Sequence, residues 1–466
     1  MIQYETLVND IHSKCNETKV AQVVRVKTVQ DVVRTIQVAK STRQSVSIAG
    51  GRHAMGGQQF GTDTILLDMR QLNRITAFDK QCGQITVEAG IEWPALINGY
   101  LTMQTESDQQ WGIAQKQTGA DRLSIGGAIA ANIHGRGLQM RPFIQDIVSL
   151  TLVDAEGNVV CCSRTENREL FRLVLGGYGL FGVVVSATIQ LMPRQKVRRD
   201  VTMQTIDQVL TCFDDRIADG YLYGDFQFGT DAQADTFLND GVMSCYRPVS
   251  KDMPILDSQQ ELSETDWANL LYLGHVDKSA AFAYYTSHYC QTSGQIYWSD
   301  TQQMSVYLDD YHTQLDQQMG VATPCSEIIT ELYVPRHSLV TFMELVRDLC
   351  RTRQIDVIYG TVRLIETDNE SFLAWAREPY ACVIFNLHTA QDTASLAKTG
   401  EDFRQLIDAA IAFGGSYYLT YHRFARRDQV LSCYPNMPDL LAEKLLYDPE
   451  ERFQSNWYRH YKAMFL

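Results

Sequence analysis

The sequence lacks several features that would assign a protein of this size to a common functional class. It has 11 cysteines in 466 residues but no C-x-x-C pair, and it has no apolar run of about 18 residues, the length of a membrane span. Its polar N-terminal segment has no apolar signal-peptide core, so we expect a cytoplasmic protein without a transmembrane segment. The cysteines lack metal-ligand spacing, so we expect reduced thiols that pack as small hydrophobes and no bound metal.

Positive charge is also scarce. Lys and Arg number 41 against 55 for Asp and Glu, which gives a formal net charge of −14. Because a duplex nucleic acid would be repelled by this charge, and no basic stripe offsets it, we expect no nucleic-acid partner. The strongest basic run, 194–199, is predicted to lie at a domain linker.

Two familiar nucleotide-binding motifs are missing. The chain has no GKS or GKT of a Walker loop, and no G-x-G-x-x-G follows its first predicted strand. Glycine instead gathers in four clusters, within 50–57, 126–127, 135–137 and 176–182. Tight turns would explain one cluster, but four together indicate backbone that approaches a ligand closely. Successive backbone N–H groups in such loops suit a pyrophosphate, so the sequence predicts a bound dinucleotide.

The hydrophobic pattern of the first 70 residues predicts a strand at 20–26, a helix at 28–39 and strands at 45–49 and 65–69. Thr28 is the expected N-cap of this helix. Strand, helix and strand in this order favour a βαβ unit, in which ligands bind beyond the carboxyl ends of the strands.

Further along, the pattern predicts a strand from Gln84, a helix at 93–101, a hairpin at 146–162 and a helix at 167–175. From about residue 200 aromatic residues become more frequent and strands alternate with helices such as 340–351. The whole chain therefore reads as α+β. We expect domains at 15–195 and 196–430, with a helical tail at 431–466.

Four segments, in order, resemble motifs of one family: 48–57, 124–137, 176–184, and Tyr447-Asp448-Pro449 with Phe453. The chain resembles FAD-linked oxidases of the vanillyl-alcohol-oxidase type, whose FAD domain is named after p-cresol methylhydroxylase (PCMH). The sugar, aldonolactone and alditol oxidases and the decaprenylphosphoryl-ribose oxidase-like members are the most similar. The resemblance implies a two-subdomain PCMH-type FAD-binding domain, a substrate-binding cap domain with an antiparallel sheet, and a tail that returns to the FAD domain.

The resemblance also implies FAD as cofactor. In several relatives the histidine at the place of His53 bonds covalently to the flavin; the alternative is a hydrogen-bonding loop histidine beside non-covalent FAD. His134 is expected to contact the flavin rather than act as a base. The residues implied to hold FAD are Ala49, Gly50, Gly51, Arg52, His53, Ala54, Met55, Gly57, Gly119, Ser124, Gly126, Gly127, Ala130, Asn132, His134, Gly135, Gly182, Val183 and Val184.

For catalysis, the resemblance points to His422, Tyr421 or Tyr418 as the group that takes the substrate's hydroxyl proton, and to Arg363 as the group that polarises its oxygen. The sequence departs from the family here, because Tyr421 stands in place of a lysine and Thr361 in place of an acid. These departures weaken the inference that this chain shares the sugar-lactone substrate of the family. Cys382, on a strand that faces the flavin in sugar-epimerising relatives, is expected to be a core thiol.

We therefore expect an FAD-dependent oxidoreductase that oxidises a CH–OH group of a polyol, sugar or lactone. Hydride passes to flavin N5, and electrons then pass to molecular oxygen or another acceptor. One alternative is a flavin-dependent reductase or epimerase-type subunit with a separate redox partner. The other is a flavin-binding scaffold without turnover.

Overall fold

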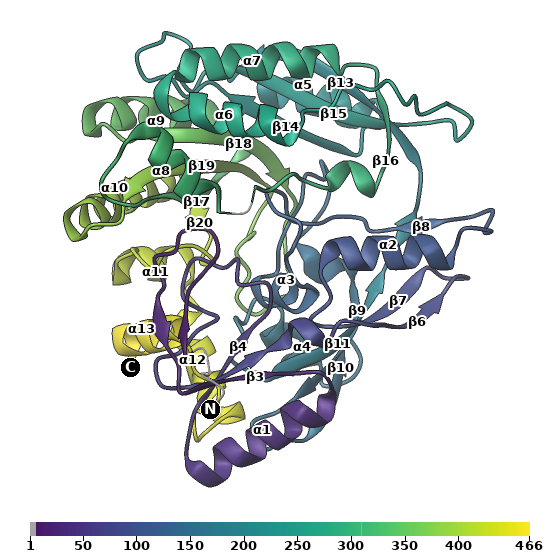
Figure 1. Cartoon of the computed structure of the whole chain (residues 1–466), viewed down its shortest axis with the longest axis vertical. Coiled ribbons are helices and arrows are strands. Elements are labelled where there is room, and N and C mark those ends of the chain that lie inside the picture. Colours follow the sequence, from purple (N-terminus) through teal and green to yellow (C-terminus); the bar gives the residue numbers. More distant parts are fainter. Residues whose placement is uncertain (1–5, 309) are drawn as a thin grey trace.

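The computed structural model describes residues 6–308 and 310–466. After a short antiparallel pair, β1 (Leu7–Val8) and β2 (Thr18–Lys19), the chain forms three short parallel strands. They lie in the order β3 (Gln22–Arg25), β5 (Ile65–Asp68) and β4 (Val46–Ala49), and α1 (Val29–Thr42) connects β3 to β4 (Figure 1). The Thr28 hydroxyl accepts the Asp31 N–H, and the Asp31 carboxylate accepts the Thr28 N–H. The predicted βαβ opening and its N-cap are confirmed, and the helix runs three residues beyond its predicted end.

A second, antiparallel sheet completes the N-terminal half. Its strands lie in the order β10 (Val159–Ser163), β9 (Ile147–Val153), β11 (Val183–Gln190), β7 (Gln84–Glu88) and β6 (Ile75–Asp79). Val153, Val183 and Val185 pack in one buried cluster with residues of the parallel sheet. The segments that connect its strands contain three helices: α2 (Trp93–Met103), α3 (Ile125–Ala131) and α4 (Arg168–Val174).

An eight-stranded antiparallel sheet forms the second half, in the upper part of Figure 1. Its order is β16 (Ile296–Trp298), β13 (Lys196–Thr205), β15 (Asp240–Val249), β14 (Tyr223–Phe228), β18 (Val357–Ile365), β19 (Tyr380–Ala390), β17 (Cys325–Pro335) and β20 (Ser416–Tyr417). The helices of this half are α5 (Val209–Ala218), α6 (Glu264–Val276), α7 (Lys278–Gln291), α8 (Tyr311–Met319), α9 (Leu339–Arg353) and α10 (Thr393–Ala412). The predicted α+β class with an antiparallel sheet is confirmed.

The C-terminal segment packs against the parallel sheet. After α11 (Arg427–Cys433) and α12 (Met437–Tyr447), Phe453 forms a parallel bridge with Val46, whose N–H donates to the Arg452 carbonyl at 2.6 Å. Phe453 lies in the same buried cluster as Val46 and Ile65, and α13 (Asn456–Phe465) follows it. The tail thus pairs with β4, the edge strand of the first sheet.

The cysteines form no disulfide in the part of the chain that the structure describes. Within the same part, no helix combines the length and the apolarity needed to cross a membrane.

Substituting Phe453→Ala is expected to destabilise the protein by about 3–5 kcal/mol, because it leaves a cavity in a core that the tail shares with the parallel sheet. The thermal midpoint of unfolding measures the effect. The matched control is Val38→Ala on the exposed side of α1, where the side chain is 50% exposed and the expected change is within about 0.5 kcal/mol. Equal shifts for both variants would contradict a structural role for the tail contact.

Candidate active site

One cavity, with a volume of about 250 Å³, lies where the two halves of the chain meet. The N-terminal half contributes segments within 48–59, 117–133 and 174–184. The second half contributes Ile329 from β17 and three residues just after β20: Tyr418, Thr420 and Tyr421. The cavity wall therefore contains three of the four motifs singled out in the sequence.

Most of the predicted site residues line this cavity. Those that do are Gly50, Gly51, Arg52, His53, Ala54, Met55, Gly119, Ser124, Gly126, Gly127, Ala130, Gly182, Val184, Tyr418 and Tyr421. The remaining predicted residues are outside its lining: Ala49, Gly57, Asn132, His134, Gly135, Val183, Arg363 and His422.

The first glycine loop leaves no room for side chains. A Cβ added at Gly50 would lie 2.0 Å from the Ser124 hydroxyl oxygen, and one at Gly51 would lie 2.2 Å from the Arg122 carbonyl oxygen. In the described ranges, neither glycine donates its N–H in a backbone–backbone hydrogen bond. Tightly packed backbone with N–H groups left for a ligand fits the phosphates of a dinucleotide.

His53 extends from this loop into the cavity wall beside a second histidine. Its Nδ1 lies 2.9 Å from His12 Nε2, and both rings line the cavity. Burial, together with the nearby His312, lowers the pKa of His12 to about 4, so His12 is neutral at pH 7. His12 was missed in the sequence, since a lone histidine far from the glycine loop carries no motif.

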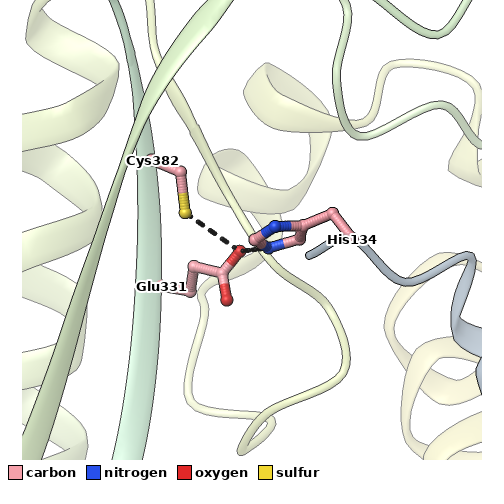
Figure 2. Close-up of side chains that lie close together, drawn as sticks. All are labelled: His134, Glu331 and Cys382. Atoms are coloured by element: carbon pink, nitrogen blue, oxygen red, sulfur yellow. Dashed lines mark hydrogen bonds and ion pairs between the residues drawn. The ribbon is translucent and has the colours of Figure 1, made fainter. Parts of the chain in front are cut away.

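A buried carboxylate, Glu331 on β17, stands behind the wall formed by Tyr421. Its Oε1 accepts from His134 Nε2 at 2.6 Å, from the Tyr333 hydroxyl and from the Cys382 thiol at 3.3 Å. Figure 2 shows the His134 and Cys382 contacts meeting at one oxygen. The other oxygen, Oε2, accepts from the Tyr421 hydroxyl at 3.3 Å. The cavity is thereby connected through Tyr421 to an internal acceptor.

The charges of this network follow from its partners. Burial alone would raise the pKa of Glu331, but His134 and Tyr333 outweigh it, and the net pKa is lowered. Burial and the neighbouring Glu331 raise the pKa of Tyr421 well above its ordinary value. At neutral pH Glu331 is therefore a carboxylate and Tyr421 a phenol. Tyr421 can accept a proton only if it passes its own to Glu331.

Tyr418 and Arg363 occupy two other sides of the site. The Tyr418 hydroxyl donates to the Ala131 carbonyl at 2.7 Å, which joins the second half of the chain to the end of α3. Arg363 Nη2 donates to the Thr118 hydroxyl at 2.6 Å, and Thr118 lines the cavity. Arg363 thus reaches the cavity through Thr118. Thr361, where the family pattern has an acid, donates to the Phe226 carbonyl inside the sheet.

His422 is not brought to the cavity. Its ring stacks on Phe424, with centroids 5.4 Å apart and planes 12° from parallel, and Phe403 packs against its edge. Among the described residues its two ring nitrogens have no hydrogen-bond partner, and burial lowers its pKa to about 4. This geometry provides no contact through which His422 would take a substrate proton.

Glu331 is the main functional candidate that sequence reasoning did not select. The sequence gives no signal for this role, because the groups that contact Glu331 are distant in the chain. His134 lies 197 residues away and Tyr421 lies 90 residues away.

Comparison with known proteins identifies the N-terminal part. Residues 20–163 match the family described as FAD binding domain. This segment is an FAD binding domain. FAD is therefore the cofactor, and the predicted resemblance to FAD-linked oxidases of the PCMH type is confirmed.

Curated relatives match over part of their length. An uncharacterized oxidoreductase, ORF5 in the fasciation locus of Rhodococcoides fascians, is 32% identical over 190 residues, 41% of this chain and 42% of that protein. L-Gulonolactone oxidase of Scyliorhinus torazame is 29% identical over 214 residues, 46% of this chain and 47% of that protein. The matches thus span less than half the length of these relatives.

Among solved structures, a solvent-stable cholesterol oxidase superimposes with a TM-score of 0.71 over 98% of this chain and 97% of its own, at 16% identity. At that identity the likeness concerns the fold alone. The fold of the whole chain, including the large antiparallel sheet, is therefore similar to that of this solved structure.

Substituting Gly51→Ala is expected to reduce the flavin content of the purified protein at least about tenfold, because the new methyl group would collide with the fixed Arg122 carbonyl. The ratio of flavin to protein absorbance measures it. Gly229→Ala is the matched control, since a Cβ there makes only ordinary contact with Phe282 at 3.6 Å. Full flavin content in the Gly51 variant would contradict the assignment of this loop to binding the FAD phosphates.

Proposed function

We propose that this protein is an FAD-dependent oxidoreductase that oxidises a CH–OH group of a polyol, sugar or lactone. The observation that carries the proposal is Tyr421, which lines the cavity and whose hydroxyl donates to the buried Glu331 carboxylate. We assign residues 15–195 and the tail at 431–466 to the FAD domain, and residues 196–430 to the substrate-binding cap.

FAD, when bound, supplies the hydride acceptor. The chain's own residues manage the proton. A substrate hydroxyl beside Tyr421 gives its proton to the phenol oxygen as the C–H bond breaks, and Tyr421 passes its proton to Glu331. His134 donates to Glu331 and holds the carboxylate in place for this transfer. The carboxylate, not a phenolate, is the final proton acceptor.

Thr118 supports the same reaction from another side. Its oxygen accepts from Arg363, so its own O–H can still donate, and Thr118 lines the cavity. A hydrogen bond from Thr118 would orient a substrate oxygen, and the Arg363 charge behind it would strengthen that bond. Arg363 therefore acts as a positioning residue, while Tyr421 touches the substrate.

The substrate class rests on the relatives. Two of them are named for aldonolactones, L-gulonolactone oxidase and the mitochondrial L-galactono-1,4-lactone dehydrogenase of Brassica oleracea, the latter 21% identical over 215 residues. Cytokinin dehydrogenase 3 of Oryza sativa subsp. japonica is 32% identical over 161 residues. We favour the hydroxylated substrates because the Tyr421–Glu331 relay takes up the proton that a CH–OH group must lose.

The direct test is anaerobic mixing of the purified flavoprotein with sugar alcohols, aldoses, aldonolactones, a sterol and a cytokinin. Bleaching of the flavin absorbance by one of the first three classes supports the proposal. Bleaching only by the sterol or the cytokinin, or by none, overturns it. The rate at which air reoxidises the bleached enzyme, compared with the rate of reoxidation by a dye without oxygen, then decides between oxygen and another electron acceptor.

Substituting Tyr421→Phe is expected to slow flavin reduction by the active substrate at least about 100-fold, since it removes the proton relay while retaining the ring. Stopped-flow reduction rates measure the effect, and Glu331→Gln is expected to give a loss of the same order. Tyr284→Phe on the exposed side of α7 is the control and should reduce at the wild-type rate. A Tyr421→Phe rate within threefold of wild type would remove Tyr421 from the mechanism.

We also propose that His53 carries the flavin covalently. The placement of His53 in the loop next to the cavity, with its ring against the neutral His12, supports a nucleophilic imidazole at this position. After acid precipitation, the wild-type pellet is expected to be yellow. The His53→Ala pellet should be colourless, with its flavin in the supernatant. A colourless wild-type pellet contradicts the covalent bond without affecting the proposed reaction.

A further inference from the structure

A second buried carboxylate, Glu327, lies on β17 four residues before Glu331 and is only 4% exposed. Two histidines from different elements face it: His275 in the last turn of α6 and His388 on β19, its register partner across the sheet. In the described part of the chain, none of these three residues lines the cavity.

The three side chains converge on one point. His275 Nε2 lies 2.8 Å from Glu327 Oε1, and His388 Nδ1 lies 3.3 Å from the same oxygen. The two nitrogens and the carboxylate oxygen all lie within 4.8 Å of one another. Ligands of a four-coordinate zinc ion at bond lengths of about 2.0–2.1 Å are about 3.3 Å apart, so small side-chain shifts suffice.

The far side of the His275 ring is held by the backbone of its own helix. Its Nδ1 lies 2.7 Å from the Leu271 carbonyl oxygen, which can only accept, so Nδ1 carries the donated proton. Nε2 faces the Glu327 carboxylate, and with Nδ1 held by the carbonyl it is the nitrogen that can offer a lone pair to a metal ion. A cation between the two satisfies both. An N–H to a backbone carbonyl behind a free nitrogen is the usual arrangement of a metal-binding histidine.

The second oxygen of Glu327 is fixed from α8. Its Oε2 accepts from the Tyr311 hydroxyl at 2.7 Å and lies 2.7 Å from His312 Nδ1. These partners orient the carboxylate so that Oε1 faces His275 and His388. The cluster thus has three side chains that can bind an ion, and Tyr311 and His312 hold the carboxylate of one of them, Glu327, in place.

We propose that His275, Glu327 and His388 bind one divalent transition-metal ion of the zinc type, with water as the fourth ligand. Two imidazoles and one carboxylate suit zinc or cobalt, whereas Mg²⁺ and Ca²⁺ take oxygen ligands. The partly exposed His388 leaves a path for the ion. The ion joins α6 to the β17–β19 pair and takes no part in the proposed oxidation.

The test uses the full-length flavoprotein, stripped with EDTA and dialysed, and titrated with Co²⁺ alone. Calorimetry is expected to show one ion bound per chain, and the difference spectrum to show the visible bands of four-coordinate cobalt beyond the flavin absorbance. Zn²⁺ should displace the cobalt, and Mg²⁺ in large excess should not.

Three variants localise the site: His275→Ala, Glu327→Gln and His388→Ala. Each should weaken Co²⁺ binding more than about 100-fold, because loss of a direct ligand exceeds the 10–100-fold cost of losing an outer partner. His337→Ala, at an exposed histidine, should bind like wild type. Glu327→Gln keeps the side-chain shape, and intact flavin absorbance in each variant shows that the chain is folded. Absence of saturable Co²⁺ binding, or binding that persists in any of the three variants, overturns the proposal.

Discussion

A buried carboxylate at the junction of the two halves constrains the rest of this structure. Glu331 is 2% exposed, and a carboxylate removed from water is costly unless other groups replace its hydration. Those groups come from both halves: His134 follows α3 of the FAD domain, while Tyr333, Cys382 and Tyr421 belong to the large sheet and the loop after β20. The satisfied network fixes the cavity wall on which the proposed chemistry depends.

The part of the cavity wall formed by the first glycine loop depends on backbone rather than on side-chain charge. Gly50 and Gly51 pack so closely against Ser124 and Arg122 that a methyl group would collide. The ammonium of Lys116, which is fully buried nearby, is already paired with Asp121 at 2.8 Å. An acidic protein can in this way hold a doubly charged pyrophosphate with N–H groups.

Glu327 and Glu331 show how one strand gives the same residue type two environments. They lie four positions apart, so both project from the same face of β17. Glu331 is surrounded by a histidine, two tyrosines and a thiol at the cavity, whereas Glu327 faces three histidines and Tyr311. The first set suits passage of a proton and the second suits a metal ion, and the two proposals stand independently.

The sequence alone determined the local structure and the cofactor. Thr28 with the apolar spacing after it specified α1, and the glycine clusters specified loops that a bulky side chain cannot enter, because these are properties of neighbouring residues. Only the tertiary structure decided which of the predicted residues reach the cavity. Tyr421 and His422 are adjacent, yet one lines the cavity and the other packs against Phe403 and Phe424. The two side chains point into different surroundings, and which of them reaches the cavity depends on Glu331 and His134, residues far away in the chain.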